Sequence, residues 1–274
     1  MTDHLLRAYA PIPAAGWRQI DDEAKTRLTP RLAARRVVDW SGPHGWMHSA
    51  TNLGRTAPVE TTPPGTKSET AIARQRRVLL LSEFRVSFTV ELTELQDAER
   101  GATDVDYADL DRATYDAALI ENRAVFHGWP DAGISGLAES SAHPSLTLGK
   151  TVTAYPHAVA KAIEVLRCAG IEGPYSLAIS PDGYTRIVET TEDGGYPLTR
   201  HLSRILGGGD IVWAPGLDGA LVVSKRGGDF TLEIGQDFSI GYTGHDAQRV
   251  TLYLEESFSF RINERDAVVV LTEE

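Results

Sequence analysis

The chain has 274 residues, 42% of them hydrophobic and 24% charged, so it can bury a sizeable core and has the composition of an ordinary globular protein. Its 27 basic and 38 acidic residues give a net charge of −11, which argues against a nucleic-acid groove lined by clustered lysine and arginine. A single cysteine, Cys168, excludes a disulfide framework and a cysteine-rich metal site. The first residues are polar, and no run of about 18 apolar residues occurs. We therefore expect a soluble, cytoplasmic protein without a membrane partner.

Residues 14–28 are predicted to form an amphipathic helix. Its apolar residues recur at helical spacing, and they are Trp17, Ile20, Ala24 and Leu28. Pro30 cannot lie inside this helix without breaking it. Thr29 and Pro30 are therefore predicted to be the N-cap and the first position of a second short helical turn.

Residues 54–66 contain three prolines and almost no apolar side chains. Such a segment cannot offset the entropy lost on ordering unless it binds something else. Two interpretations follow: a disordered loop, which the residues alone favour, or an arm that is ordered by a neighbouring subunit.

Residues 84–92 alternate strictly between apolar and polar side chains, which predicts a half-buried strand. Thr93 and Gln96 then have the spacing of a capping box, so a short helix is expected to follow and to end before Gly101. A longer helix is predicted from about residue 107 to 126, again from the helical spacing of its apolar residues.

The second half of the chain mixes helices with strands. A helix around residues 159–166 is expected to end at Gly170, with Cys168 buried on it as a small hydrophobic residue. A strand at 175–179 leads into a helix start at Ser180, and a further helix covers 198–205. The remaining segments are predicted strands at 210–213, 220–224, 230–240, 248–262 and 266–271. This order is α+β without a βαβ repeat, which argues against a doubly wound nucleotide-binding fold.

The sequence contains no complete catalytic motif. The glycines at 207–209 are not followed by the lysine and helix start of a phosphate loop. Residues 133–136 are one residue short of a nucleophile elbow. His44 and His48 are four residues apart, but the glycines and proline around them disfavour a helix, so solvated turn histidines are expected and no metal site. The residues alone indicate an α+β protein of undefined role.

The stretch from Arg226 to Tyr242 consists of two alternating apolar runs that are interrupted at Gly235. The sequence of this stretch resembles that of encapsulins, which are bacterial shell proteins with the HK97-like fold of tailed-phage capsids. Further matches follow in order along the chain: Ala10-Pro11-Ile12, Trp17, Arg35-Arg36-Val37-Val38-Asp39, Gly42-Pro43-His44-Gly45-Trp46, Glu99-Arg100-Gly101, Gly170-Ile171-Glu172-Gly173-Pro174-Tyr175, Gly195-Tyr196-Pro197-Leu198 and Tyr253-Leu254-Glu255-Glu256-Ser257. One departure is Ala34, where relatives more often carry glycine.

The resemblance implies an architecture of a peripheral domain, an axial domain and an extended loop arm. Its segments are expected at residues 1–49 (N-terminal helix and start of the peripheral domain), 50–82 (arm), 83–130 (peripheral domain), 131–220 (axial domain) and 221–274 (return strands of the peripheral domain). It also implies a non-enzymatic shell of about sixty copies. A prophage major capsid protein shares the fold and is the alternative, and a hydrolase is a third.

The resemblance further implies an enclosed cargo enzyme, a peroxidase or a ferritin-like protein, that carries a C-terminal targeting tail. The expected cargo-binding residues are Leu28, Leu32, Arg35, Asp39, Asp229, Ile234, Phe238 and Ile240. An apolar groove with charged groups at its rim suits such a tail. The alternative is that some of these aliphatic residues belong to the core.

A loop at the fivefold pore is implied for Glu189, Glu192, Asp193, Gly194, Gly195 and Tyr196. Rings of its carboxylates would favour cations, whereas the alternative is an ordinary solvated loop. We expect no cofactor: some relatives bind flavin through a tryptophan, and this sequence has Thr93 at the matching position.

Overall fold

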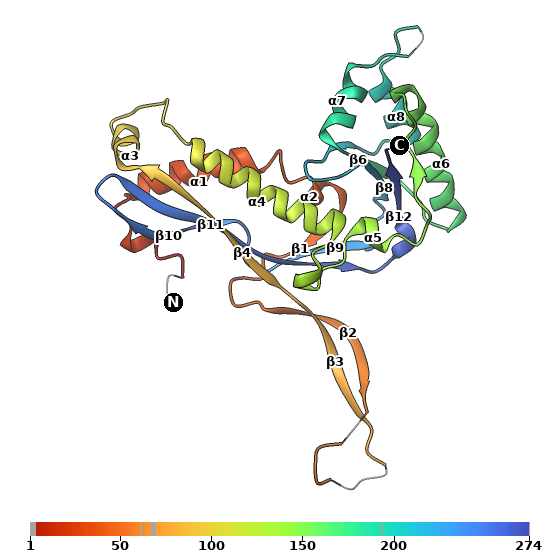
Figure 1. Ribbon diagram of the computed structural model, residues 1–274, viewed down its shortest axis with the longest axis horizontal. Helices are drawn as coiled ribbons and strands as arrows, with labels where there is room; N and C mark the ends of the chain where they lie inside the picture. Colours follow the sequence, from red (N-terminus) through yellow and green to blue (C-terminus); the bar gives the residue numbers. More distant parts are fainter. Residues whose placement is uncertain (1–3, 61, 67–69, 193, 274) are drawn as a thin grey trace.

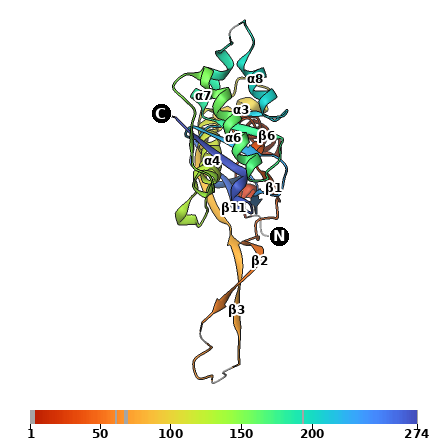
Figure 2. The ribbon, with the colours of Figure 1, turned by 90° about the vertical axis from the view of Figure 1, so that its right-hand side faces the viewer.

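The chain folds into an elongated body, a smaller lobe at one end and a projecting arm (Figure 1). The structure is a computed structural model that describes residues 4–60, 62–66, 70–192 and 194–273. Turned by 90°, the body is a thin slab and the arm continues in its plane (Figure 2).

The longest strand organises the sheet of the body. β11 (Arg249–Ile262) pairs antiparallel with β4 (Ser82–Glu91), and also with β10 (Ser239–His245) and β9 (Phe230–Ile234). β1 (Asp39–Ser41) adds to β9 in parallel, which completes five strands. Inward-facing apolar residues alternate along β4 as the sequence predicts, with Phe84, Phe88 and Val90 buried.

Two long helices cover this sheet, α1 (Ala14–Leu28) and α4 (Ala108–His127). Both were predicted from their apolar stripes, and both bury them: α1 through residues such as Ile20 and α4 through residues such as Leu110. The short helices α2 (Ala34–Val37) and α3 (Leu92–Glu99) flank them.

The smaller lobe contains a second five-stranded sheet, ordered β5-β12-β8-β6-β7, with helices packed around it (Figure 1). The strands are β5 (Leu146–Thr147), β6 (Tyr175–Ile179), β7 (Ile211–Trp213), β8 (Ala220–Ser224) and β12 (Val268–Thr272). The helices are α5 (Leu137–Ser140), α6 (Tyr155–Cys168), α7 (Pro181–Glu189) and α8 (Leu198–Ile205). Short 3₁₀ turns occur at Arg7–Tyr9, Pro130–Ala132, Val152–Ala154 and Arg265–Ala267. Residues 221–274, expected as return strands of the peripheral domain, thus contribute to both sheets.

The arm is an antiparallel pair of strands, β2 (Ala50–Val59) and β3 (Ala73–Leu80), that leaves the body between β1 and β4. Most of its side chains are exposed. Of residues 54–66, which the sequence presents as either a loop or an arm, residues 54–59 lie on β2.

Three local predictions are wrong. Thr29 is the C-cap of α1, and its hydroxyl donates back to the Lys25 carbonyl (2.7 Å), so it starts no second helical turn. Thr93 is not an N-cap, because α3 already begins at Leu92, whose N–H donates to the Gln248 carbonyl at 2.8 Å. Cys168 is exposed, because it lies beside the buried stripe of α6 and not on it.

Candidate functional site

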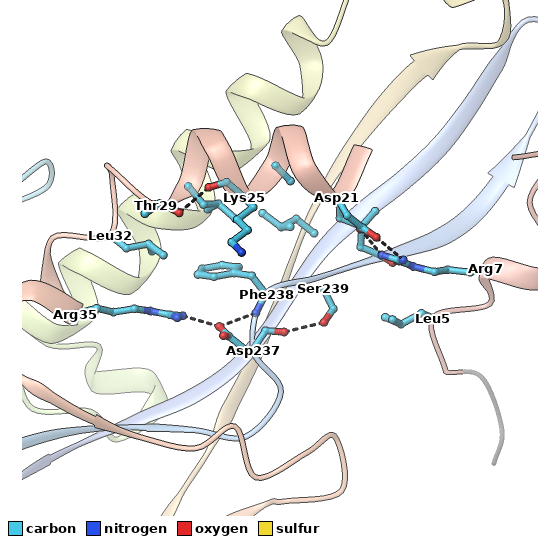
Figure 3. A pocket seen from close by; sticks show the side chains of 14 residues that line it. Leu5, Arg7, Asp21, Lys25, Thr29, Leu32, Arg35, Asp237, Phe238 and Ser239 are labelled. Carbon is cyan, nitrogen blue, oxygen red and sulfur yellow. Dashed lines mark hydrogen bonds and ion pairs between the residues drawn. The ribbon is translucent and has the colours of Figure 1, made fainter. Parts of the chain in front are cut away.

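A groove of about 570 Å³ runs between α1 and the turn that joins β9 to β10. Leu28 and Leu32 line it from the helical side, and Phe238 and Ile240 line it from the strand side. Ile240 is buried and Phe238 is half-buried, so Phe238 presents the more accessible apolar surface. We call this the cargo groove below, after the role that the sequence predicts for it (Figure 3).

Local geometry fixes Phe238 in the groove. Gly235 follows the last residue of β9, and a Cβ there would lie only 2.6 Å from the Ser257 hydroxyl oxygen and 2.7 Å from Leu81 Cδ2, so glycine favours the close packing of the chain at this turn. Beyond the turn, the Phe238 ring packs edge-on against Phe84, with 6.2 Å between ring centroids. The Arg35 guanidinium lies 5.2 Å from the centroid of the same ring.

Five of the eight predicted cargo residues line this groove: Leu28, Leu32, Arg35, Phe238 and Ile240. Ile234 does not, because its side chain is fully buried in the core. Asp39 accepts a hydrogen bond from the Gly228 N–H (2.6 Å), and Asp229 is a buried partner of Arg226, with 2.7 Å between Nη2 and Oδ1. These two aspartates lie together at the start of the parallel strands β1 and β9, a strand's length from the groove.

Several residues that line the groove were not predicted from the sequence, among them Arg7, Asp21, Lys25 and Asp237. Arg7 and Asp21 form a two-bonded ion pair at one end, with N–O distances of 2.8 and 2.6 Å. Lys25 projects from α1 toward Phe238 (Figure 3), and among the described residues it has no ion-pair partner. Lys25 lies one helical turn before Leu28, so the two side chains share a face of α1. This spacing is the sequence signal that could have predicted Lys25 as a residue of the groove.

Beneath the other end of the groove, Arg35 holds three carboxylates. Its Nη2 atom lies 2.8 Å from Glu121 Oε2, 2.7 Å from Glu256 Oε1 and 2.8 Å from Asp237 Oδ1. Burial alone would lower the pKa of Arg35, but the charges of Glu121 and Glu256 outweigh it and raise that pKa.

The two glutamates of this cluster are fully buried. Burial raises the pKa of Glu121, although Arg35 opposes the shift. Burial, and then the charge of Glu121, raises the pKa of Glu256 well above its usual value. Glu121 Oε1 and Glu256 Oε2 have no donor in the described structure, so one proton shared between the carboxyl groups would satisfy both oxygens.

The predicted pore loop joins α7 to α8 at the tip of the smaller lobe (Figure 1). The Glu192 N–H donates to the Tyr196 carbonyl (2.8 Å), and the Gly195 N–H donates to the Glu192 carbonyl (2.9 Å). Glu192 Oε1 lies 2.7 Å from His201 Nδ1 on α8. Glu189, Gly194, Gly195 and Tyr196 are exposed, and Asp193 lies outside the described residues.

The described residues contain no group of three or more histidine, cysteine or acidic side chains arranged to hold a metal ion. The rings of His44 and His48 are 4.7 Å apart, and each histidine bonds a hydroxyl nearby: Ser41 for His44 and Thr51 for His48. Among the described residues, no helix has both the length and the apolarity needed to cross a bilayer.

The sheet with its long backing helix, the terminal lobe and the arm define the HK97-like capsid fold. A virus-like particle from Pyrococcus furiosus has this fold, with a TM-score of 0.61 at 15% identity over 91% of this chain and 98% of that one. The Mycobacterium phage Bobi structure gives 0.54 at 14% identity over 88% and 90% of the two chains. The capsid of an empty GTA particle gives 0.53 at 14% identity over 88% and 89%.

Within this fold class, the chain belongs to the encapsulin shell protein family. Residues 1–259 match the family described as "Encapsulating protein for peroxidase". The type 1 encapsulin shell protein of Rhodospirillum rubrum is 44% identical over 97% of this chain and 95% of its own length. That of Rhodococcus erythropolis is also 44% identical, over 98% and 99%. The chain is thus a shell protein that assembles into capsid-like particles, a structural and not an enzymatic role.

Proposed function

We propose that the shell encloses a cargo enzyme whose C-terminal tail binds in the cargo groove. The observation that carries this proposal is the accessible apolar face of Phe238 between two charged ends, because an extended, apolar tail could bury that face. The family description points to a peroxidase as cargo, and a ferritin-like protein is the second candidate.

The charges of the groove refine the chemistry of the tail. Arg7 is neutralised by Asp21, and Arg35 by its carboxylates, which leaves Lys25 as a cation directed toward Phe238. A tail that places an acidic group beside its apolar residues would pair with Lys25. Of the three predicted cargo residues outside the groove, Asp229 and Ile234 are buried, and only the exposed Asp39 could meet a tail that continues along β1.

Replacing Phe238 tests the groove. Phe238→Asp would place an unpaired charge against the apolar tail, so cargo should be lost from purified shells while the shells stay intact. Tyr115→Asp introduces the same charge at an exposed aromatic residue on α4, away from the groove, and should retain cargo. The measurement is the protein co-purified with shells from the native host, quantified by mass spectrometry. Retention of cargo by Phe238→Asp shells would refute the groove as the docking site.

We also propose that the shell is the smallest icosahedral assembly, about sixty copies, and that it lies in the cytoplasm. With a chain mass of 29.8 kDa, the empty particle should weigh about 1.8 MDa. Native mass spectrometry measures this directly, and a multiple of that mass would show a larger shell.

The loop between α7 and α8 is proposed to line the fivefold pore, with Glu189, Glu192 and Asp193 forming acidic rings. Its place at the tip of the smaller lobe and the exposure of Glu189 support this assignment. The smaller lobe, including residues 131–220, would then be the axial domain. The body would be the peripheral domain, formed by residues 1–49, 83–130 and most of 221–274, with 50–82 as the arm.

A further inference from the structure

Residues 4–6 run beside β10, the strand at one edge of the five-stranded sheet of the body. The Tyr242 N–H donates to the Leu5 carbonyl at 2.8 Å, and Arg7 Nε donates to the Ile240 carbonyl at 2.7 Å. Leu5 and Arg7 also line the cargo groove (Figure 3). We call residues 4–6 the strap, because they cover part of the edge of β10 at one end of the groove.

His4 anchors the strap. Its ring stacks on Trp46, in the turn between β1 and β2, with 4.6 Å between ring centroids and 15° between the planes. The Tyr253 hydroxyl donates to the His4 carbonyl at 3.4 Å. His4 Nε2 lies 3.5 Å from Glu255 Oε1, and both atoms are buried without a hydrogen bond in the described structure. A proton on His4 Nε2 would give both atoms a partner and make their contact an ion pair.

The charges around this pair leave one oxygen of Glu255 to His4. The other oxygen, Glu255 Oε2, accepts from Arg85 Nε on β4 at 2.7 Å. Arg85 also lies 3.2 Å from Glu83, and its guanidinium lies 4.5 Å from the centroid of the Tyr253 ring. Among the described residues, no other charged side chain forms an ion pair with His4 or Glu255. Histidine ordinarily changes charge between pH 5 and 8, so the strength of this anchor should vary over that range.

Leu6 holds backbone strain next to the anchor. Its φ is 55° and its ψ is 21°, and among the described residues it is the only non-glycine residue with a positive φ. A leucine adopts this left-handed conformation only where its surroundings hold it there. His4 supplies that restraint on one side, and the ion pair of Arg7 with Asp21 supplies it on the other. Once His4 is released, the strain favours another conformation of the strap.

We propose that the strap is a pH-sensitive cover at one end of the cargo groove, closed while protonated His4 pairs with Glu255 and open once His4 loses that proton. Opening removes Leu5 from the groove and frees the Tyr242 N–H at the edge of β10. An extended tail can add to such an edge through backbone hydrogen bonds, so the strap and the tail compete for the same N–H. This competition rests on the proposed binding of a cargo tail in the groove.

Hydrogen exchange of intact shells between about pH 5.5 and pH 8 tests the cover, with rates corrected for the intrinsic pH dependence of exchange. In the parent, the protection factor of the Tyr242 amide should fall about tenfold over this range, because one proton changes the opening equilibrium by at most about tenfold per pH unit. His4→Gln removes the charge, so its protection should be low at every pH. His4→Arg keeps a charge beside Glu255, so its protection should stay high.

His157→Gln is the matched control, because His157 is an exposed histidine on α6, in the smaller lobe. Its shells should show the pH dependence of the parent. A parent whose Tyr242 protection does not change with pH, or a His4→Gln variant that keeps the parental dependence, would overturn the pH-sensitive anchor.

Cargo load gives the second readout. Shells of His4→Gln purified from the native host should carry about twice the cargo of parent shells or more, because the open fraction of the strap limits tail binding. An unchanged load, despite lost protection at Tyr242, would overturn the competition between strap and tail. Phe238→Asp identifies a failure of the proposed function itself: if those shells keep their cargo, the tail docks elsewhere and the strap does not regulate it.

Discussion

Among the described residues, Arg35 is the one cation that contacts the three carboxylates Glu121, Glu256 and Asp237 beneath the cargo groove. This excess of acidic groups affects the protonation of the buried pair. Glu121 on α4 and Glu256 on β11 are both fully buried, so two negative charges there would be costly. A proton shared between them would remove one charge and satisfy the two oxygens that otherwise lack a donor. The cluster thereby joins α2, α4, β11 and the turn that carries Phe238.

The raised pKa of Glu256 makes stability depend on pH with a definite sign. The pKa of Glu256 is raised on folding, so its contribution is complete below the unfolded pKa of about 4.5 and is lost as pH rises through the folded value. Each proton taken up on folding corresponds to about 1.4 kcal/mol of unfolding free energy per pH unit.

Glu256→Gln should therefore flatten the pH dependence. The amide can donate to Glu121 and accept from Arg35 without taking up a proton. Between about pH 5 and pH 8, the melting temperature of the variant shells should fall less than that of the parent, and at the upper end it should be higher. Differential scanning fluorimetry of intact shells measures both slopes. Parallel slopes for variant and parent would mean that the pair holds no proton.

At the scale of elements, regular periodicity was sufficient to predict β4, α1, α4 and α6 from the sequence. Their apolar residues follow one period from end to end, so local pattern and tertiary burial agree. The first and last residues of helices and strands were harder to predict from the sequence. Leu92 starts α3 because its N–H bonds Gln248, a partner 156 positions away that no local pattern around Thr93 reveals.

Only some of the residues that line the groove could be predicted from the sequence, because the others depend on non-local pairing. Leu28 and Phe238 could be named from the family resemblance, and the structure brings them together across α1 and the β9–β10 turn. Asp39 and Asp229 were grouped with them, although the parallel pairing of β1 with β9 places both aspartates at the opposite end of those strands. Strand pairing is non-local, so sequence alone could not separate the two groups.

The pore loop supports a prediction at the same scale. If this loop lines the fivefold pore as proposed, Glu189→Lys with Glu192→Lys should slow entry of a cationic dye into the shell and speed entry of an anionic dye of matched size, because the charge of the ring would change sign. Glu192→Gln, which keeps a polar group near His201, should have a smaller effect. Stopped-flow uptake gives the rates. Equal rates for all shells would place small-molecule traffic at another opening.

For the whole molecule, we expect the arm to be needed for assembly of the particle and not for folding of the body. Removing the distal part of the arm, residues 54–76, and joining its ends with a short glycine linker should leave a folded subunit that forms no full-size particle, because most arm residues are exposed within the chain. Light scattering distinguishes the outcomes, and full-size shells from the deletion variant would show that the arm is dispensable.

The position of β11 and β12 along the chain has a consequence for synthesis. β11 is the strand on which β4, β9 and β10 all pair, and β12 lies between β5 and β8, yet both strands come after every other strand of the described chain. At 5–20 residues per second, β4 leaves the ribosome roughly 10–30 s before β11 begins. Until then α3 and α4 have no finished sheet to pack on. A product that terminates before β11 has neither sheet complete. We therefore expect prematurely terminated chains not to enter the shell.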